Sequence, residues 1–217
     1  MTAMNPAPSG WQPFGPDLHR YVVKEKAFPQ LIGLHGAHGA GKATVAAYLC
    51  DAHDFRSYAL ADPLRRALYA LDPLLSSRES LRTLIDSGGW TDALTHRIHG
   101  PEVSRLLRTM RLDVARDVFG PDVWLRRLEA ATVADAELLG VAPAVITDVL
   151  TADEAQWVLD NGGVVWQVDR PGHVPTVQIH DRLISAVINN DATELALTRR
   201  VDRAIAGISR INDAVLA

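Results

Sequence analysis

The sequence predicts an α/β fold, namely a doubly wound, five-stranded parallel sheet with helices on both faces and a helical lid or insertion. Three observations support this prediction. Five short apolar runs alternate with helix-like segments, the pattern of parallel strands joined by helical crossovers. A glycine-rich turn separates the first apolar run from the first helix-like segment. The middle of the chain holds more helical sequence than a simple crossover needs, which indicates an insertion.

The glycine-rich turn spans residues 36–44 and lies between the apolar run Leu31–His35 and a helical pattern that carries Val45 and Leu49. Glycine lets backbone N–H groups point inward, and the N-terminus of the next helix adds the positive end of its dipole. Strand, turn and helix in this order are what a phosphate-binding loop requires. The sequence therefore predicts a nucleotide-binding P-loop. The residues expected to bind the ATP phosphates are Gly36, His38, Gly39, Ala40, Gly41, Lys42, Ala43 and Thr44.

Lys42 is the predicted catalytic cation of this loop. The only lysines are Lys24, Lys26 and Lys42, and every other permanently cationic side chain is arginine. A lysine kept in such a chain suits the compact charge of a phosphate cradle. Ala43 stands where such loops usually place a Mg²⁺-binding hydroxyl, and Thr44 follows, a form that resembles the loops of adenylate kinase and its relatives. The alternative is a glycine-rich turn that binds no ligand.

Length and charge limit the other possibilities. The 217 residues, 47% hydrophobic and 22% charged, suffice for one well-buried domain. A net charge of −4 argues against extended nucleic-acid binding, so no nucleic-acid partner is expected. No secretory segment or long apolar run indicates export or a membrane partner. The single Cys50 fits a reducing, cytoplasmic location.

The first part of the chain has its own character. Residues 1–30 contain five prolines together with Trp11 and Phe14, and proline at this density disfavours regular structure. We expect a proline-rich N-terminal arm over 1–30 and a kinase domain over 31–217. The arm packs either on its own domain or on a second subunit, which leaves a homodimer open.

A second strand is predicted over Phe55–Leu60, and it runs into Asp62, Arg65 and Arg66. Because the carboxyl ends of parallel strands face the ligand crevice, Asp62 and either Arg65 or Arg66 are expected near the acceptor phosphate, and we predict Asp62 and Arg65 as the substrate-binding residues. The alternative is that Asp62 caps a helix beginning near Pro63 and that both arginines are solvated.

Helices are predicted over Leu64–Leu75, Arg78–Ile85 and Pro101–Val118, with a break at Gly88-Gly89-Trp90. We expect a helical insertion over residues 76–118, approximately, that binds the substrate or covers the site as a lid. Its many arginines suit phosphoryl transfer, which needs positive charge spread around the moving group. The alternative is a solvated surface on which acidic neighbours pair with them. We predict catalytic roles for Arg105 and Arg116, and substrate-binding roles for Trp90, Arg108 and Arg111.

Later strand ends supply the remaining candidates. Ala144–Asp148 is an apolar run that ends in aspartate, the position at which P-loop proteins hold hydrated Mg²⁺. Asp148 and Thr44 are therefore the predicted metal site. The predicted strand Val164–Val168 leads to Arg170, which either contacts substrate phosphate, as we predict, or flanks a turn.

The predicted final strand, Val187-Ile188, is followed by a long helix. Asn190 or Asp191 is the predicted cap of that helix, and a nucleotide contact is the alternative.

The order of these motifs resembles the bacteriophage deoxynucleoside monophosphate kinase family from Leu31 to about Ala206. The segments that carry the resemblance are 36–44, 61–64, 89–90, 101–116, 120–124, 146–149, 154–155, 162–163, 170–172, His180 and 190–191. The resemblance implies a P-loop kinase fold and phosphorylation of a deoxynucleoside monophosphate to its diphosphate, with ATP and Mg²⁺. It also implies supply of precursors for phage DNA synthesis in the cytoplasm of a bacterial host.

Several positions depart from that family. Ala43 replaces a frequent aspartate, Ser104 a usual arginine, and Leu150 the arginine of an Asp-Val-Arg segment. The usual glutamine and glycine of the central helix are Arg108 and Arg111, and Arg182-Leu183 stands where Ser-Glu is expected.

Two other functions remain as alternatives. The departures suggest a nucleotide-binding homologue with weakened catalysis and a regulatory role. The third hypothesis is a P-loop kinase for another small acceptor, such as dephospho-coenzyme A or a nucleoside. An acceptor hydroxyl needs a general base, for which Asp62 is the well-placed candidate.

Overall fold

The computed structural model describes residues 30–120 and 122–216, with the side chains of 115–117 and 209–216 left out. The predicted N-terminal arm lies outside this range except for Gln30. Within the described residues, no helix is long and apolar enough to cross a membrane.

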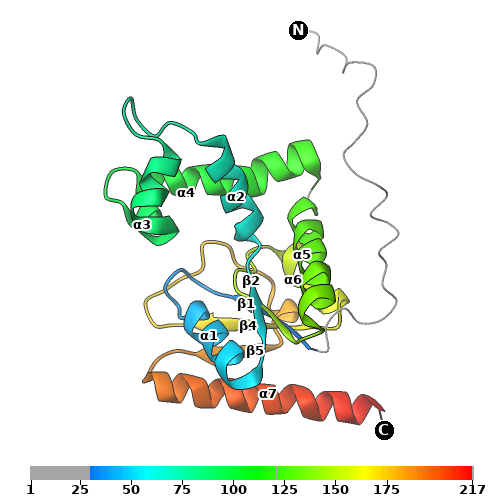
Figure 1. Cartoon of the computed structure of the whole chain (residues 1–217). Helices are drawn as coiled ribbons and strands as arrows, with labels where there is room; N and C mark the ends of the chain where they lie inside the picture. The colour runs from blue at the N-terminus through cyan, green and yellow to red at the C-terminus, as the bar shows by residue number, and fades with distance from the viewer. Residues whose placement is uncertain (1–29, 121, 217) are drawn as a thin grey trace, which may run out of the picture.

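A parallel sheet of five strands forms the centre of the molecule, in the order β2-β3-β1-β4-β5 (Figure 1). This confirms the predicted sheet. The central strand is buried along its whole length, as expected for a strand covered on both faces. The strands are β1 Leu31–His35, β2 Arg56–Tyr58, β3 Ala144–Ile146, β4 Val164–Asp169 and β5 Ala186–Asn189.

Helices cover both faces of the sheet, which makes it doubly wound. One hydrophobic core lies between the sheet and two helices, α1 (Lys42–His53) and α7 (Glu194–Leu216). A second core lies between the opposite face and two others, α5 (Val123–Leu139) and α6 (Ala152–Asp160). A short 3₁₀ turn, η3 (Asp181–Leu183), adds Leu183 to the second core. Each face of the sheet is thus sealed from water, and its carboxyl edge is left for ligands.

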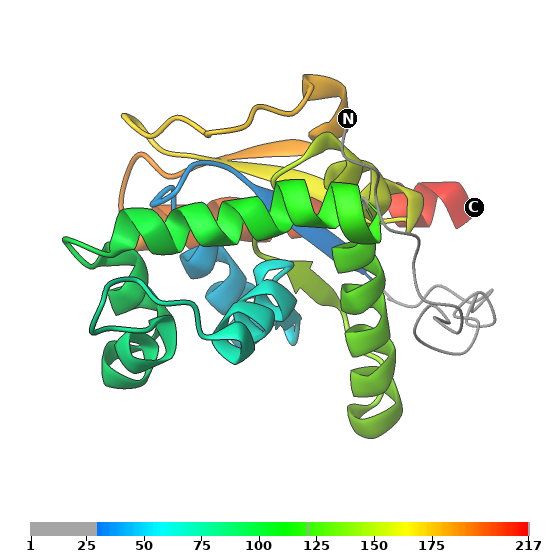
Figure 2. The ribbon, with the colours of Figure 1, turned by 90° about the horizontal axis from the view of Figure 1, so that it is seen from above.

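A separate helical lobe, residues 61–119, stands above the carboxyl edge of the sheet (Figure 1). Its helices surround a small core of their own, formed by Leu68, Leu81, Leu84, Ala93 and Val103. Figure 2 shows the last two helices as one nearly straight rod. The lobe consists of α2 (Ala61–Leu71), α3 (Leu81–Thr95), α4 (Gly100–Thr109) and the widened π-helix η2 (Met110–Phe119). The predicted break occurs at Gly89, whose φ of 78° interrupts α3.

The junction after β2 differs from the prediction. The strand ends at Tyr58, two residues earlier than expected, because Leu60 already stands at the start of α2. The helix begins at Ala61 and ends at Leu71, where Asp72 takes a left-handed conformation with φ of 50°. The interpretation of Asp62 as a helix cap is wrong, since Asp62 lies inside the first turn and its side chain makes no capping bond.

The predicted cap of the C-terminal helix is also wrong. The helix begins at Glu194, and the hydroxyl of Thr193 accepts a hydrogen bond from the Ala196 N–H. Asp191 instead pairs with Arg200 at 2.6 Å. The helix therefore begins two or three residues later than predicted.

We expect Leu34→Ala to lower the free energy of unfolding by about 2–5 kcal/mol, because it opens a cavity in the central strand, where Leu34 is fully buried. Urea unfolding measures the change. Leu138→Ala is the matched control; this leucine is 80% exposed, so its loss should change stability by no more than about 0.5 kcal/mol. Equal effects of the two substitutions would contradict the assignment of the core.

Candidate phosphate-transfer site

The loop between β1 and α1 has the backbone shape that its glycines allow. Gly36 has φ of 141°, and a Cβ there would lie 2.3 Å from the Val168 carbonyl oxygen of β4. Gly41 has φ of 104°, and a Cβ there would lie 2.4 Å from Asn190 Nδ2. Both conformations are ones that side chains rarely adopt. The two glycines are therefore required for the loop to lie tight against the ends of β4 and β5.

Lys42 begins α1 and turns back into the loop. Its Nζ donates to the carbonyl oxygens of Gly36, at 2.8 Å, and Ala37, at 2.7 Å. Burial lowers the pKa of Lys42, and the nearby Asp148 carboxylate opposes part of that effect. The ammonium is thus held inside the loop, at the position from which it can reach an incoming phosphate.

The other loop residues fall into two groups. Ala40 is buried, whereas His38 and Ala43 are exposed and Thr44 is half-buried. Thr44 lies in the first turn of α1, two residues from Lys42. Contacts of these side chains with ATP stay predictions.

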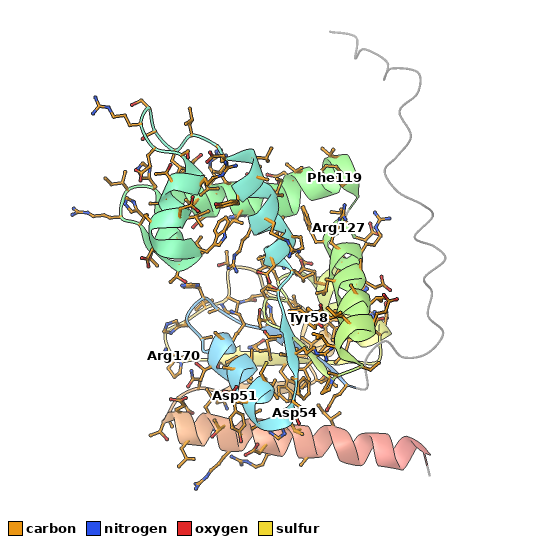
Figure 3. All side chains as sticks on the ribbon, viewed as in Figure 1. Asp51, Asp54, Tyr58, Phe119, Arg127 and Arg170 are labelled. Atoms are coloured by element: carbon orange, nitrogen blue, oxygen red, sulfur yellow. The ribbon has the colours of Figure 1, made fainter. Side chains whose placement is uncertain are left out.

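Two side chains from the far strands hold the loop in place. Asn190 Nδ2 donates to the Ala40 carbonyl at 2.9 Å. Arg170, labelled in Figure 3, donates to the Gly39 carbonyl at 3.1 Å. The His173 ring lies against Gly39, where an added Cβ would be 3.2 Å from it. Arg170, predicted to bind substrate, therefore contacts the phosphate loop in this structure.

Asp148 lies just beyond β3 and accepts hydrogen bonds from the start of the helical lobe. Its Oδ1 accepts from the Leu60 N–H at 2.7 Å, and its Oδ2 from the Ala61 N–H at 2.9 Å. Arg111 Nη1 also lies 3.3 Å from Oδ2. A carboxylate at the N-terminus of a helix is favourable, because it faces unpaired N–H groups and the positive end of the dipole.

The residues present fit a hydrated Mg²⁺. Asp148 is 24% exposed, and its Oδ1, which accepts from the Leu60 N–H, keeps a lone pair that could accept from a metal-bound water. The Thr44 hydroxyl is a second possible contact to that hydration shell. Among the described residues no cluster of three or more His, Cys, Asp or Glu could hold a metal. Phosphate oxygens and water would therefore supply most ligands, as is usual for Mg²⁺.

Arg111 is held by acidic groups at the foot of the lobe. Its Nε and Nη2 donate to Glu154 at 2.7–3.1 Å, and its Nη2 also donates to the Asp148 carbonyl at 2.8 Å. Only 11% of the Arg111 side chain is exposed, and 10% of Glu154. The structure therefore places this predicted substrate ligand in an ion network beside the phosphate loop.

A cavity of about 330 Å³ opens beside α2 and is lined by Asp62, Arg65, Arg66, Tyr69 and Trp90. The Arg65 guanidinium lies 5.9 Å from the centre of a Trp90 ring and 3.3 Å from Asp62. Its Nε is buried and has no hydrogen-bond partner among the described residues. A buried donor without a partner calls for an explanation, and a bound anion is one. The structure brings together three of the predicted substrate residues here.

The remaining predicted arginines are not part of the cavity lining. Arg105 is 59% exposed and makes a two-pronged ion pair with Glu102, at 2.6 and 2.7 Å. Arg108 is exposed. Arg116 belongs to η2, and its side chain lies outside the described part of the structure. The surface alternative therefore describes Arg105 in this structure, and its catalytic role stays a prediction.

Sequence reasoning missed the part played by Glu154. Its carboxylate accepts from the N–H groups of Leu150 and Thr151, at 2.7 and 3.0 Å, while the Thr151 hydroxyl accepts from the Glu154 N–H. This capping box has a sequence signature, Thr-x-x-Glu, which could have been found. Its partnership with Arg111, 43 residues away in sequence, has no such signal.

The parallel sheet, the glycine-rich loop with its inward lysine and the aspartate beyond β3 define a P-loop nucleotide kinase. A mimivirus protein (Acanthamoeba polyphaga mimivirus), provisionally named a deoxynucleotide monophosphate kinase, is 30% identical over 151 residues, which cover 65% of this chain and 75% of that protein. The chain belongs to the deoxynucleotide monophosphate kinase family. No protein-family model matches the sequence.

Solved structures of small-molecule kinases also align with the chain, at low similarity. A sugar kinase from Janibacter sp. HTCC2649 is 17% identical with a TM-score of 0.43, covering 82% of this chain and 92% of its own. Shikimate kinase from Aquifex aeolicus is 11% identical with a TM-score of 0.40, covering 83% and 98%. Dephospho-CoA kinase from Campylobacter jejuni is 15% identical with a TM-score of 0.42, covering 84% and 97%.

His35 provides a test of the packing behind the loop. It is 2% exposed, its Nδ1 lies 3.0 Å from the Val149 carbonyl, and burial lowers its pKa from the usual 6.5. Below that value the unfolded chain gains a proton that the folded protein resists, so stability is lost as the pH falls. In the wild type, the free energy of unfolding should fall as the pH is lowered below 6.5. We expect His35→Gln to reduce the slope of that fall by up to about 1.4 kcal/mol per pH unit.

Urea unfolding of the wild type and of His35→Gln between pH 7.5 and 5 measures how the free energy of unfolding of each depends on pH. Identical slopes in the two proteins would show that His35 is freely protonated in the folded state.

Proposed function

We propose that this protein transfers the γ-phosphoryl group of ATP to a deoxynucleoside monophosphate, which yields ADP and a deoxynucleoside diphosphate. The main observation behind the proposal is that two sites suited to anions lie at the same edge of the sheet. One is the phosphate loop with Lys42, and the other is the cavity lined by Arg65 and Arg66. Asp148 connects the two, because it lies in the electrostatic field of Lys42 and accepts from the first N–H of the helix that lines the cavity.

The donor half of the site would work through the loop and its lysine. Backbone N–H groups of the loop and the N-terminus of α1 face the phosphates, and Lys42 exchanges its two carbonyl partners for phosphate oxygens. Bound Mg²⁺, with Asp148 and Thr44 beside its hydration shell, would neutralise charge on the phosphates. Arg170 keeps the loop closed from the β4 side.

The acceptor half would work through the cavity of the lobe. Arg65 and Arg66 offer positive charge to the acceptor phosphate, and the Trp90 ring offers a flat surface to the base. An oxygen of that phosphate forms a bond to the γ-phosphorus while the bond to the ADP oxygen breaks. No general base is required, since the acceptor oxygen is already anionic at neutral pH.

A deoxynucleoside monophosphate acceptor is favoured over a hydroxyl acceptor by the mimivirus relative, which is provisionally named a deoxynucleotide monophosphate kinase. In the structure the Asp62 carboxylate lies 3.3 Å from the Arg65 guanidinium, so the two side chains form one ion pair in the wall of the cavity. The product would serve as a precursor for DNA synthesis.

Lys42→Ala is the first test. We expect the wild-type protein to release ADP from ATP and Mg²⁺ with one or more deoxynucleoside monophosphates. The substitution should reduce that rate at least about 100-fold, because it removes the charge that faces the transferring group. A coupled ADP-release assay measures it.

Arg78→Met is the control, since this arginine is exposed on the same lobe and does not line the cavity. Absence of turnover with every acceptor, while ATP binds the wild type and not the Lys42 variant, would replace the proposal with a nucleotide-binding role.

Arg65→Met tests the acceptor cavity. We expect KM for the monophosphate to rise roughly 10- to 100-fold, the loss of one or two charge-assisted hydrogen bonds. KM for ATP should stay unchanged, because Arg65 contacts none of the loop. Steady-state kinetics with either substrate varied separates the two, and Arg78→Met should alter neither. An equal rise in both KM values would contradict the assignment of the cavity to the acceptor.

A further inference from the structure

The helical lobe is connected to the body at two places, and one carboxylate contacts both. The chain enters the lobe at Leu60 and Ala61, whose N–H groups donate to Asp148 at 2.7 and 2.9 Å. The chain returns through η2, where Arg111 lies 3.3 Å from the same carboxylate and 2.8 Å from the Asp148 carbonyl. A shift of the lobe must therefore alter the contacts of Asp148.

Arg111 is fixed by more than this one contact. All three of its guanidinium nitrogens have acceptors, and Glu154 takes two of them in a fork. Glu154 in turn is bound by the N–H groups of Leu150 and Thr151, so it cannot follow a moving lobe. An arginine with this planar, nearly buried arrangement holds its partners in one geometry, which a lysine cannot reproduce. Arg111 also lies in the π-helical part of the rod, and such irregular turns often occur at functional sites.

The charges in this network connect it to the phosphate loop. The Asp148 carboxylate lies in the electrostatic field of Lys42 and 3.3 Å from the Arg111 guanidinium. Its segment is also hydrogen-bonded to the strand that leads into the loop, because the Val149 N–H donates to the Leu34 carbonyl at 3.1 Å and His35 Nδ1 lies 3.0 Å from the Val149 carbonyl. When triphosphate oxygens pair with Lys42, the attraction of that ammonium for Asp148 is weakened. The carboxylate is then left to Arg111 and to the N–H groups of Leu60 and Ala61. The free energy of ATP binding thus differs between a tightly held lobe and a loosely held one. Such a difference is what couples ATP binding to binding of the monophosphate in the lobe.

We propose that Arg111 is a positioning residue that couples occupancy of the phosphate loop to the placement of the acceptor cavity in the helical lobe. The inference rests on the proposed function, because it requires two nucleotides in two sites. Arg111 touches neither substrate in this account and acts through Asp148.

The test measures this coupling directly. Calorimetric titration gives the Kd of a deoxynucleoside monophosphate with and without a saturating, non-hydrolysable ATP analogue and Mg²⁺. In the wild type we expect the analogue to tighten monophosphate binding about fivefold or more. In the Arg111→Met, Glu154→Gln double variant that factor should fall to about one, while the analogue still binds, because Lys42 and its loop are left intact.

The double variant is used because Arg111→Met alone leaves Glu154 charged and buried, which threatens folding. Arg111→Lys keeps the charge but loses the fork, and should restore only part of the coupling. The Arg126→Met, Asp122→Asn variant removes an exposed ion pair of 3.1 Å at the start of α5 and should keep full coupling.

A double variant that folds and retains the wild-type coupling factor would overturn the inference, as would a wild type that binds both ligands without coupling. Both results would leave the proposed function standing. A wild type that binds the ATP analogue but no monophosphate would instead refute the proposed function, and this inference with it.

Discussion

The carboxylate of Asp148 is the contact on which the arrangement of the site depends. It lies two residues beyond β3, accepts from the N–H groups of Leu60 and Ala61, pairs with Arg111 of the lobe and lies in the electrostatic field of Lys42. Without it, the Leu60 and Ala61 N–H groups would lose their side-chain acceptor at the edge of the sheet. A carboxylate is stabilised at a helix N-terminus, because the unpaired N–H groups and the helix dipole both favour negative charge there.

The phosphate loop is shaped from outside as much as by its own sequence. Gly36 leaves room for the Val168 carbonyl, and Gly41 leaves room for the Asn190 side chain that donates to Ala40. The ends of β4 and β5 thus press against the loop from one side, and Lys42 bonds its carbonyls from within. For the phosphate ligand that we propose, a loop already held in one shape would lower the cost of binding.

The high arginine content of the lobe did not predict where each arginine side chain lies. The many arginines of this region suggested positive charge spread around the transferred group, yet the structure gives these side chains different surroundings. Arg65 faces a cavity, Arg111 is locked to Glu154 and Asp148, and Arg105 pairs with Glu102 at the surface. Exposed pairs of that last kind contribute little to stability, whereas the nearly buried network cannot lose one member without a large penalty. Arg111, which stands where the family usually has glycine, is therefore paired with Glu154 in this structure.

The sequence by itself determined the fold and the phosphate loop. Apolar runs such as Leu31–His35, the glycine spacing and the lone lysine of the loop are local signals, and each follows from backbone geometry within a few residues. Only the tertiary structure decided which arginine meets which carboxylate and where the cavity that we propose for the acceptor lies. The partners of Arg111 are 37 and 43 residues away, and those of Asp148 nearly 90. Contacts at such separations depend on how helices pack, and packing leaves no periodic pattern in the sequence that could be read in advance.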